Sequence, residues 1–238
     1  MKKYELTNET KTLAGGTVLH RIRALRDMPR HGVKAGDLGG LIEKENNLSQ
    51  DGNAWISDDA CVSDDATVYD DATVYGDAKV SGDAKVSGNA WVSGNAEVSD
   101  NACISGNAEV SDNSTVYGNA CISGDARVSG DARVSGDARV FGDADVYGNA
   151  WVFGDAKVSA NSEYMVIKNT WSSGRWFTYT SSNKKWVVGC FYGTGEELIA
   201  KAYKDSELSG KCYEAIVRAV ETIEAAKAEA KGENNGSK

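Results

Sequence analysis

The sequence predicts a mainly β protein built around a triangular, parallel β-helix. Residues 52–159 form 18 consecutive six-residue repeats without a gap, reading Gly/Asp, Asn/Asp, Ala, any residue, Val/Ile, any residue. The fifth position is Val or Ile in all 18 repeats, and the third is Ala in 17 of them. Because a period of six fits neither a helical face nor a heptad, the repeat favours short strands joined by turns.

Each repeat is expected to form one side of a triangle. Ala and Val/Ile alternate with polar residues, which is the period-two pattern of a strand with one buried face. The Gly-Asn or Gly-Asp pair then turns the chain, since these residues tolerate left-handed backbone angles. Three repeats therefore close one coil, and the 18 repeats predict six coils around a core of stacked aliphatic side chains.

This pattern resembles the hexapeptide-repeat family of left-handed parallel β-helices. Read from the aliphatic residue, Ile56 to Cys61 fits the aliphatic-x-x-x-small-x repeat of that family. The resemblance implies a left-handed coil. It also agrees with a homotrimer, which would cover some of the outward-facing aromatic rings of the repeats, such as Trp55 and Trp91.

The segment before the repeats predicts an N-terminal β cap over residues 1–51. A solenoid end exposes unpaired strand edges and an open core, so it needs a cover. Residues 3–12 and 17–26 are expected to form two strands. The segment after these strands leads into Asn46–Ser49, which is expected to form irregular first coils of the solenoid.

Residues 160–231 predict a C-terminal α+β cap. Strand-like segments are expected at 163–168, 175–180 and 185–192, followed by a helix that begins after Thr194 and a second helix over about 209–230. The last residues, 232–238, are expected to be a disordered tail.

Composition limits the classes of partner. There are 26 basic and 35 acidic residues, a net charge of −9, which argues against broad binding to nucleic acid or to an anionic membrane. The five cysteines contain no CxxC pair, so reduced thiols in a cytosol fit better than a disulfide framework. No apolar stretch predicts a signal peptide or a membrane span. We therefore expect a cytoplasmic protein.

The resemblance also implies two chemistries whose residues are missing from the repeats. Many members of the family are acyltransferases with a catalytic histidine near a subunit interface, and others are zinc enzymes with three histidine ligands. Here the repeats contain no histidine, since His20 and His31 both precede them. Cys103 and Cys121 should stack one above the other, but no further ligand is in register with them. We predict no catalytic residue, no metal and no cofactor, with acyl transfer kept as an alternative.

The most suggestive stretch for ligand binding lies in the C-terminal cap. Between residues 160 and 193 there are four basic residues and one acidic residue, and the cations alternate with aromatic rings. Cations beside aromatic faces suit a phosphate-bearing ring ligand, and Gly-Thr-Gly before a helix can present backbone N–H groups to an anion. The candidate ligand-binding residues are Arg175, Trp176, Tyr179, Lys184, Lys185, Trp186, Tyr192 and Thr194. The alternative is a small β cap whose rings form its own core.

A second resemblance covers the remaining ends of the chain. The C-terminal stretch is similar to a module that follows hexapeptide repeats in uncharacterised proteins of phages, prophages and gut bacteria, and 19–25 with 34–49 resemble the head of the phage members. The matching C-terminal residues are Ser173-Gly174-Arg175, Phe177-Thr178, Gly189 to Thr194, Glu197 and Tyr213-Glu214. The resemblance implies a phage-type origin and a location in the host cytoplasm.

Three functions are open at this point. The first is a non-enzymatic, trimeric binding protein that sequesters a small anionic, nucleotide-like ligand, for example a host immune signal. The second is a structural scaffold whose caps bind a host protein. The third is an acyltransferase of the hexapeptide type.

Overall fold

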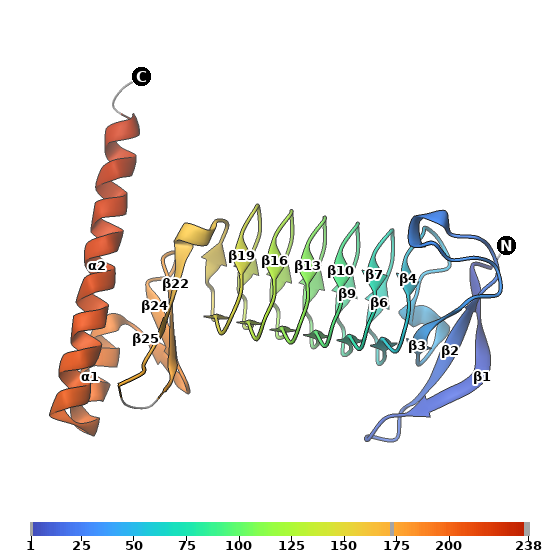
Figure 1. Cartoon of the computed structure of the whole chain (residues 1–238), viewed down its shortest axis with the longest axis horizontal. Helices are drawn as coiled ribbons and strands as arrows, with labels where there is room; N and C mark the ends of the chain where they lie inside the picture. The colour runs from blue at the N-terminus through green and yellow to red at the C-terminus, as the bar shows by residue number, and fades with distance from the viewer. Residues whose placement is uncertain (1, 172–173, 236–238) are drawn as a thin grey trace. The chain divides into compact units, whose positions relative to one another are not determined.

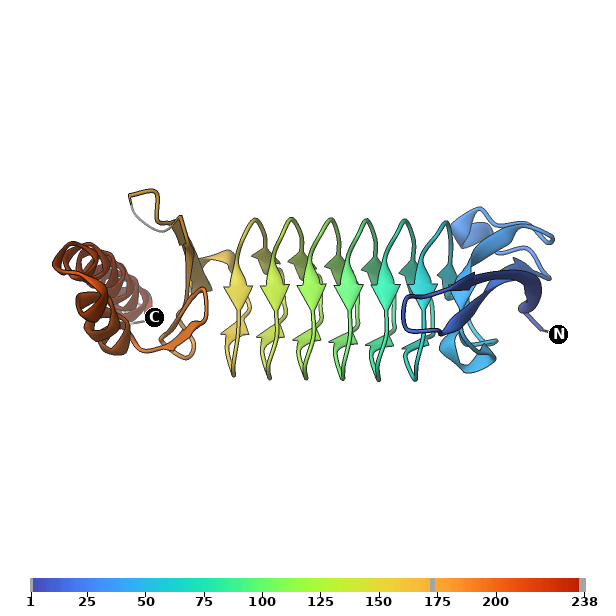
Figure 2. The same cartoon turned by 90° about the horizontal axis from the view of Figure 1, so that it is seen from below.

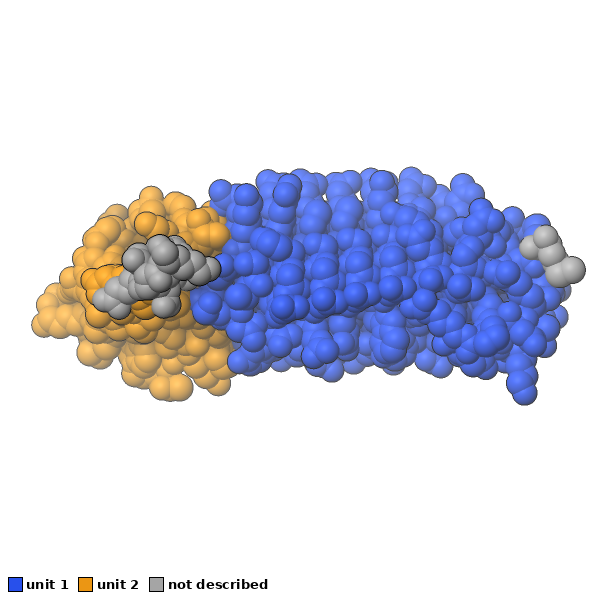
Figure 3. Space-filling view, turned by 90° about the horizontal axis from the view of Figure 1, so that it is seen from above, with its two compact units in different colours: residues 1–163 blue, residues 164–238 orange. Residues whose placement is uncertain are grey.

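The computed structural model describes residues 2–171 and 174–235, which belong to two compact units, Met1–Glu163 and Tyr164–Lys238 (Figure 3). The predicted fold class is confirmed. The first unit is a parallel β-solenoid of about seven turns, and the second combines an antiparallel sheet with two helices.

Each six-residue repeat forms one short strand, and the strands stack on three sides of the solenoid (Figure 2). Side 1 holds β4 (Trp55–Ile56), β7 (Thr73–Val74), β10 (Trp91–Val92), β13 (Glu109–Val110), β16 (Arg127–Val128) and β19 (Asp145–Val146). Side 2 holds β5 (Cys61–Val62), β8 (Lys79–Val80), β11 (Glu97–Val98), β14 (Thr115–Val116), β17 (Arg133–Val134) and β20 (Trp151–Val152). Side 3 holds β6 (Thr67–Val68), β9 (Lys85–Val86), β12 (Cys103–Ile104), β15 (Cys121–Ile122), β18 (Arg139–Val140) and β21 (Lys157–Val158).

Residues three repeats apart lie directly above one another, as the six-residue period predicts. Val92 pairs with Val110 and Ile104 with Ile122, in parallel register. The Ala and Val/Ile positions of the repeats are buried, and together they fill the core. Ser114 replaces one Ala, and its hydroxyl donates a hydrogen bond of 2.6 Å to the carbonyl of Ser111, so this buried polar group is satisfied.

An antiparallel hairpin and an irregular coil precede the repeats (Figure 1). The strands are β1 (Tyr4–Thr12), β2 (Val18–Ala24) and β3 (Leu38–Ile42), which confirms both predicted strands in slightly shorter form. The strand β3 then pairs in parallel with β5, and Leu48 forms a parallel bridge to Val68. Two short 3-10 helices, Pro29–His31 and Glu45–Asn47, connect these pieces. Residues 38–48 thus add one irregular turn to the six regular coils.

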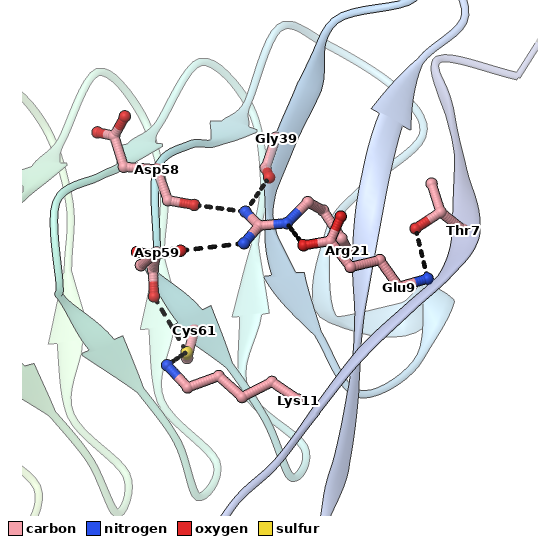
Figure 4. Close-up of polar contacts among 8 residues, drawn as sticks. All are labelled: Thr7, Glu9, Lys11, Arg21, Gly39, Asp58, Asp59 and Cys61. Atoms are coloured by element: carbon pink, nitrogen blue, oxygen red, sulfur yellow. Dashed lines mark hydrogen bonds and ion pairs between the residues drawn. The ribbon is translucent and has the colours of Figure 1, made fainter.

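Arg21 joins the hairpin to the first regular coil (Figure 4). Its guanidinium forms ion pairs with Glu9 at 2.6 Å and with Asp59 at 3.0 Å. It also donates hydrogen bonds to the carbonyls of Gly39 and Asp58, at 2.9 and 2.8 Å. The hydrogen bond to the Asp59 carboxylate, and then that to the Glu9 carboxylate, raise the pKa of Arg21. The N-terminal cap is therefore held by a mostly buried cation with four oxygen partners.

Lys3 is a second buried cation, and it predicts an unusual pH dependence of stability. Its side-chain Nζ donates a hydrogen bond of 2.8 Å to the carbonyl of Ala54. Burial, and then the nearby charge of Arg26, lower the pKa of Lys3 from 10.5 to about 8. Between these two pH values the unfolded chain binds more protons than the folded chain, so stability increases as pH rises.

We expect the free energy of unfolding to increase by about 2 kcal/mol from pH 8 to pH 10. Urea unfolding at a series of pH values measures it, and Lys3→Met should flatten the profile. The window ends near pH 10 because burial raises the pKa of Tyr4, whose contribution to stability is lost at higher pH. A flat wild-type profile, or the same rise in the Lys3→Met variant, contradicts the prediction.

The second unit packs two helices against one face of a four-stranded antiparallel sheet (Figure 1). The elements are β22 (Tyr164–Lys168), β23 (Trp176–Thr180), β24 (Lys185–Val188), β25 (Phe191–Gly193), α1 (Gly195–Asp205) and α2 (Glu207–Asn235). The predicted strand at 185–192 is two strands, because Gly189, with φ of 57°, turns the chain between them. The helix α2 continues past the expected start of the tail at Gly232, and 236–238 lie outside the described residues.

Among the helices that the structure describes, none is both long and apolar enough to cross a membrane.

Candidate functional site

The sheet of the second unit divides the predicted binding residues between its two faces. Successive side chains of a strand point to opposite faces. Tyr179 and Trp186 therefore lie on the same face as Phe177, where they pack in the core against α1 and α2. The rings of Tyr179 and Trp186 are 5.1 Å apart, and burial raises the pKa of Tyr179 to about 12. Both residues stabilise the fold of this unit, which matches the alternative that the sequence left open for its rings.

Three more of the candidates lie on the opposite face of the sheet. The ammonium of Lys185 lies 6.0 Å from the ring centroid of Tyr192, and that of Lys168 lies 5.2 Å from the ring of Trp176. Lys184 is exposed in the turn before β24, with φ of 53°. Lys168 and Lys185 thus form two separate pairs with rings, in which each ammonium already contacts an aromatic face.

Thr194 caps helix α1, as predicted. Its Oγ1 accepts a hydrogen bond from the backbone N–H of Glu197, and its own backbone N–H donates to the Glu197 carboxylate at 2.7 Å. The bonds that the Glu197 carboxylate accepts from the backbone N–H of Thr194, and then from its hydroxyl, lower the pKa of Glu197. The chain therefore places its own carboxylate at this helix start, where an anionic ligand was expected.

Arg175 is a predicted residue that borders a cavity of this unit. The cavity has a volume of about 270 Å³ and lies between the sheet and the helices. Arg175 precedes β23, Cys190 lies in the turn between β24 and β25, and Phe191 is the first residue of β25. Lys201 and Asp205 come from α1, and Tyr213 from α2; Val188, Leu198 and Ala202 complete the lining.

The cavity combines cations with aromatic rings. The ammonium of Lys201 lies 5.6 Å from the ring centroid of Phe191. The Tyr213 ring is held edge-on against Phe177, with centroids 4.8 Å apart. A Cβ on Gly189 would lie 3.5 Å from Cδ of Arg175, so the Arg175 side chain runs across this turn. Among the described lining residues, two cations and one carboxylate leave a surplus of one positive charge.

Sequence reasoning missed Phe191, Lys201, Asp205 and Tyr213. The signal for the helical residues is their spacing, because Leu198, Lys201 and Asp205 recur at the three- and four-residue intervals of one helix face. For Phe191 the signal is alternation with Tyr192, which puts the two rings on opposite faces of β25. Neither signal says which helix face meets which end of the sheet.

The stacked cysteines of side 3 and both histidines lie in the first unit, outside this cavity. Cys103 and Cys121 lie one above the other on neighbouring strands of side 3, as expected, and both thiols are free. His20 Nδ1 lies 3.4 Å from the carbonyl of Thr7, and His31 Nε2 lies 2.6 Å from that of Asn53. Within residues 2–171 and 174–235, no three His, Cys, Asp or Glu side chains are grouped to hold a metal ion.

Comparison with known proteins adds no name to this site. No known protein-family model matches the chain, and no curated protein matches it significantly.

Proposed function

We propose that this chain is a non-enzymatic binding protein of the phage type that sequesters a small anionic, nucleotide-like ligand. The observation that carries the proposal is the cavity of the second unit, where Arg175 and Lys201 stand beside the rings of Phe191 and Tyr213. Guanidinium and ammonium groups bind phosphate through charge-assisted hydrogen bonds, and aromatic rings accept the faces of a base. The volume of about 270 Å³ is close to the lower end of the range for small-ligand pockets, so the cavity suits a ligand of mononucleotide size.

A homotrimer in the host cytoplasm is part of the proposal. Trp91 and Tyr147 are exposed rings on side 1 of the solenoid, and the ring of Phe141, which follows β18 of side 3, is 39% exposed. A second copy of the chain would cover it, and a rigid trimer would carry three cavities. Native mass spectrometry reports the number of subunits, and a monomer at micromolar concentration contradicts this part.

Calorimetric titration with nucleoside monophosphates and cyclic dinucleotides tests the binding function. We expect Lys201→Ala to weaken binding by about tenfold to a hundredfold, as for loss of one hydrogen bond to a charged group. Lys211→Ala is the matched control, because Lys211 is an exposed lysine of the same unit, paired with Glu207 outside the cavity. Asp205→Asn should strengthen binding of an anion, since it removes the only carboxylate among the described lining residues.

Three results contradict the proposal. These are no heat with any nucleotide, equal loss of affinity in the Lys201 and Lys211 variants, and weaker binding after Asp205→Asn. A stoichiometric protein partner in a pull-down, without a bound small molecule, favours the scaffold instead, which the exposed Phe141 ring also suits. Binding of acetyl-coenzyme A would favour the acyltransferase, for which the repeats supply no histidine as a general base.

A further inference from the structure

A second cavity lies on side 1 of the solenoid, entirely within the first unit. It has a volume of about 280 Å³ and lies between the Pro29–His31 turn and the strands β4, β7 and β10. Its lining includes Arg30, His31, Trp55, Thr73, Tyr75 and Trp91. None of these residues belongs to the cavity described above.

Three aromatic rings shape this cavity. Tyr75 and Trp91 meet edge to face, with centroids 6.3 Å apart and an interplanar angle of 83°, so they form a corner. Trp91 is 50% exposed, so half of its surface is open to a ligand. Trp55 is 1% exposed, and its indole N–H has no hydrogen-bond partner among the described residues. That nitrogen is closed off from solvent, so Trp55 contributes a wall to the cavity and no accessible donor.

The charges around the cavity are already compensated. Arg30 donates to the carboxylate of Asp71 at 2.9 Å and to the side-chain oxygen of Asn89 at 2.8 Å. His31 Nε2 must carry a proton to donate to the Asn53 carbonyl, which leaves Nδ1 to accept from the Thr73 hydroxyl at 3.4 Å. Burial lowers the pKa of His31, which keeps its ring neutral. The cavity therefore suits a ring without a net charge.

We propose that this cavity binds one uncharged planar heteroaromatic ring, of the nucleobase class, stacked in the corner made by Tyr75 and Trp91. Base-on-aromatic stacking tolerates different bases, because every base has a π face. Ser57 lines the cavity, and its hydroxyl can donate to or accept from the edge of such a ring. The proposal stands apart from the cavity of the second unit, because it needs no phosphate.

Titration of the full chain with adenosine, guanosine and cytidine, which carry no phosphate, tests this site by calorimetry. We expect Trp91→Ala to weaken nucleoside binding by about tenfold to a hundredfold, the loss for one stacked base. Tyr147→Ala is the matched control, because Tyr147 is an exposed ring that follows β19 on the same side, outside the cavity. Lys201→Ala should also leave nucleoside affinity unchanged, which separates the two cavities.

The results that overturn the proposal are distinct from a folding failure. Trp91 is half exposed, so circular dichroism and the melting temperature of Trp91→Ala should match the wild type. No nucleoside binding at millimolar concentration overturns the proposal, as does equal affinity in the Trp91 variant. Methyl glycosides that bind as tightly as nucleosides would assign the corner to sugars and overturn it as well.

Discussion

Ile104→Ala is expected to lower the free energy of unfolding by about 2–5 kcal/mol. Ile104 is fully buried and lies in register between Val86 and Ile122 of the neighbouring coils. Each coil of a solenoid contacts only its neighbours, so the cavity left by truncation is not filled by side chains from elsewhere. Urea unfolding followed by circular dichroism measures the loss.

The matched control for this substitution is the adjacent residue. Cys103 points outward on the same strand, and Cys103→Ala should change the free energy of unfolding by about 0.5 kcal/mol or less. Hydrogen exchange should accelerate most in the coil that contains Ile104 and in the coils next to it, because coupling is between neighbours. Equal losses from the two substitutions would mean that the alternation of buried and outward positions is not what stabilises the coil.

Gly124→Ala is expected to destabilise the protein by about 2–4 kcal/mol. Gly124 begins a repeat with φ of 72°, where a side chain is strained, and a Cβ there would lie 2.9 Å from the backbone nitrogen of Gly142 in the next coil. Both atoms belong to stacked backbone, so neither can move aside as a flexible side chain would. Thermal and urea unfolding of the variant measure the cost.

The larger substitution Gly124→Asp should cost less than Gly124→Ala. Five repeats begin with Asp in the same left-handed conformation, and in each case the residue one coil further on is Gly. Asp100 shows why: its carboxylate accepts a hydrogen bond of 3.0 Å from the backbone N–H of Gly118, directly above. Gly124 has Gly142 in that place, so Asp can make the same bond, and Ala cannot.

The comparison of the two variants tests the turn rule itself. If Gly124→Asp proves less stable than Gly124→Ala, side-chain volume matters more than the hydrogen bond between coils. The rule also explains where Asp does not occur. No repeat that begins with Asp lies directly above another that begins with Asp. Two carboxylates stacked in this way would repel each other.

The repeats could be predicted from the sequence because their interactions are local or strictly periodic. The helix cap at Thr194 depends on residue type and on a neighbour a few residues away. The turn at Gly124 and the burial of Ile104 depend on residue type and on neighbours one coil away. Such features repeat with the chain, so one rule covers them all.

The candidate sites could be predicted only in part. Of the residues proposed as ligand contacts, Arg175 borders a cavity, and Trp186 is in the core. Charge and aromatic content showed which segment to inspect, but they did not show which face of the sheet the helices would cover. Trp55 illustrates the same limit, because it occupies an outward position of its repeat and is nevertheless buried, with Gly39 of the N-terminal cap packed close to its ring.

The sequence by itself therefore determined the three-sided coil, its register and its turns, since a six-residue period with a buried aliphatic position places residues three repeats apart above one another. Only the tertiary structure decided which side chains meet in the two cavities. The cavity of the second unit brings together Arg175 from the start of a strand and Lys201 and Tyr213 from two helices. The cavity of the first unit brings together Arg30 and Trp91, which are separated by a long stretch of chain. Contacts of this kind depend on how separate elements pack, which no local pattern encodes.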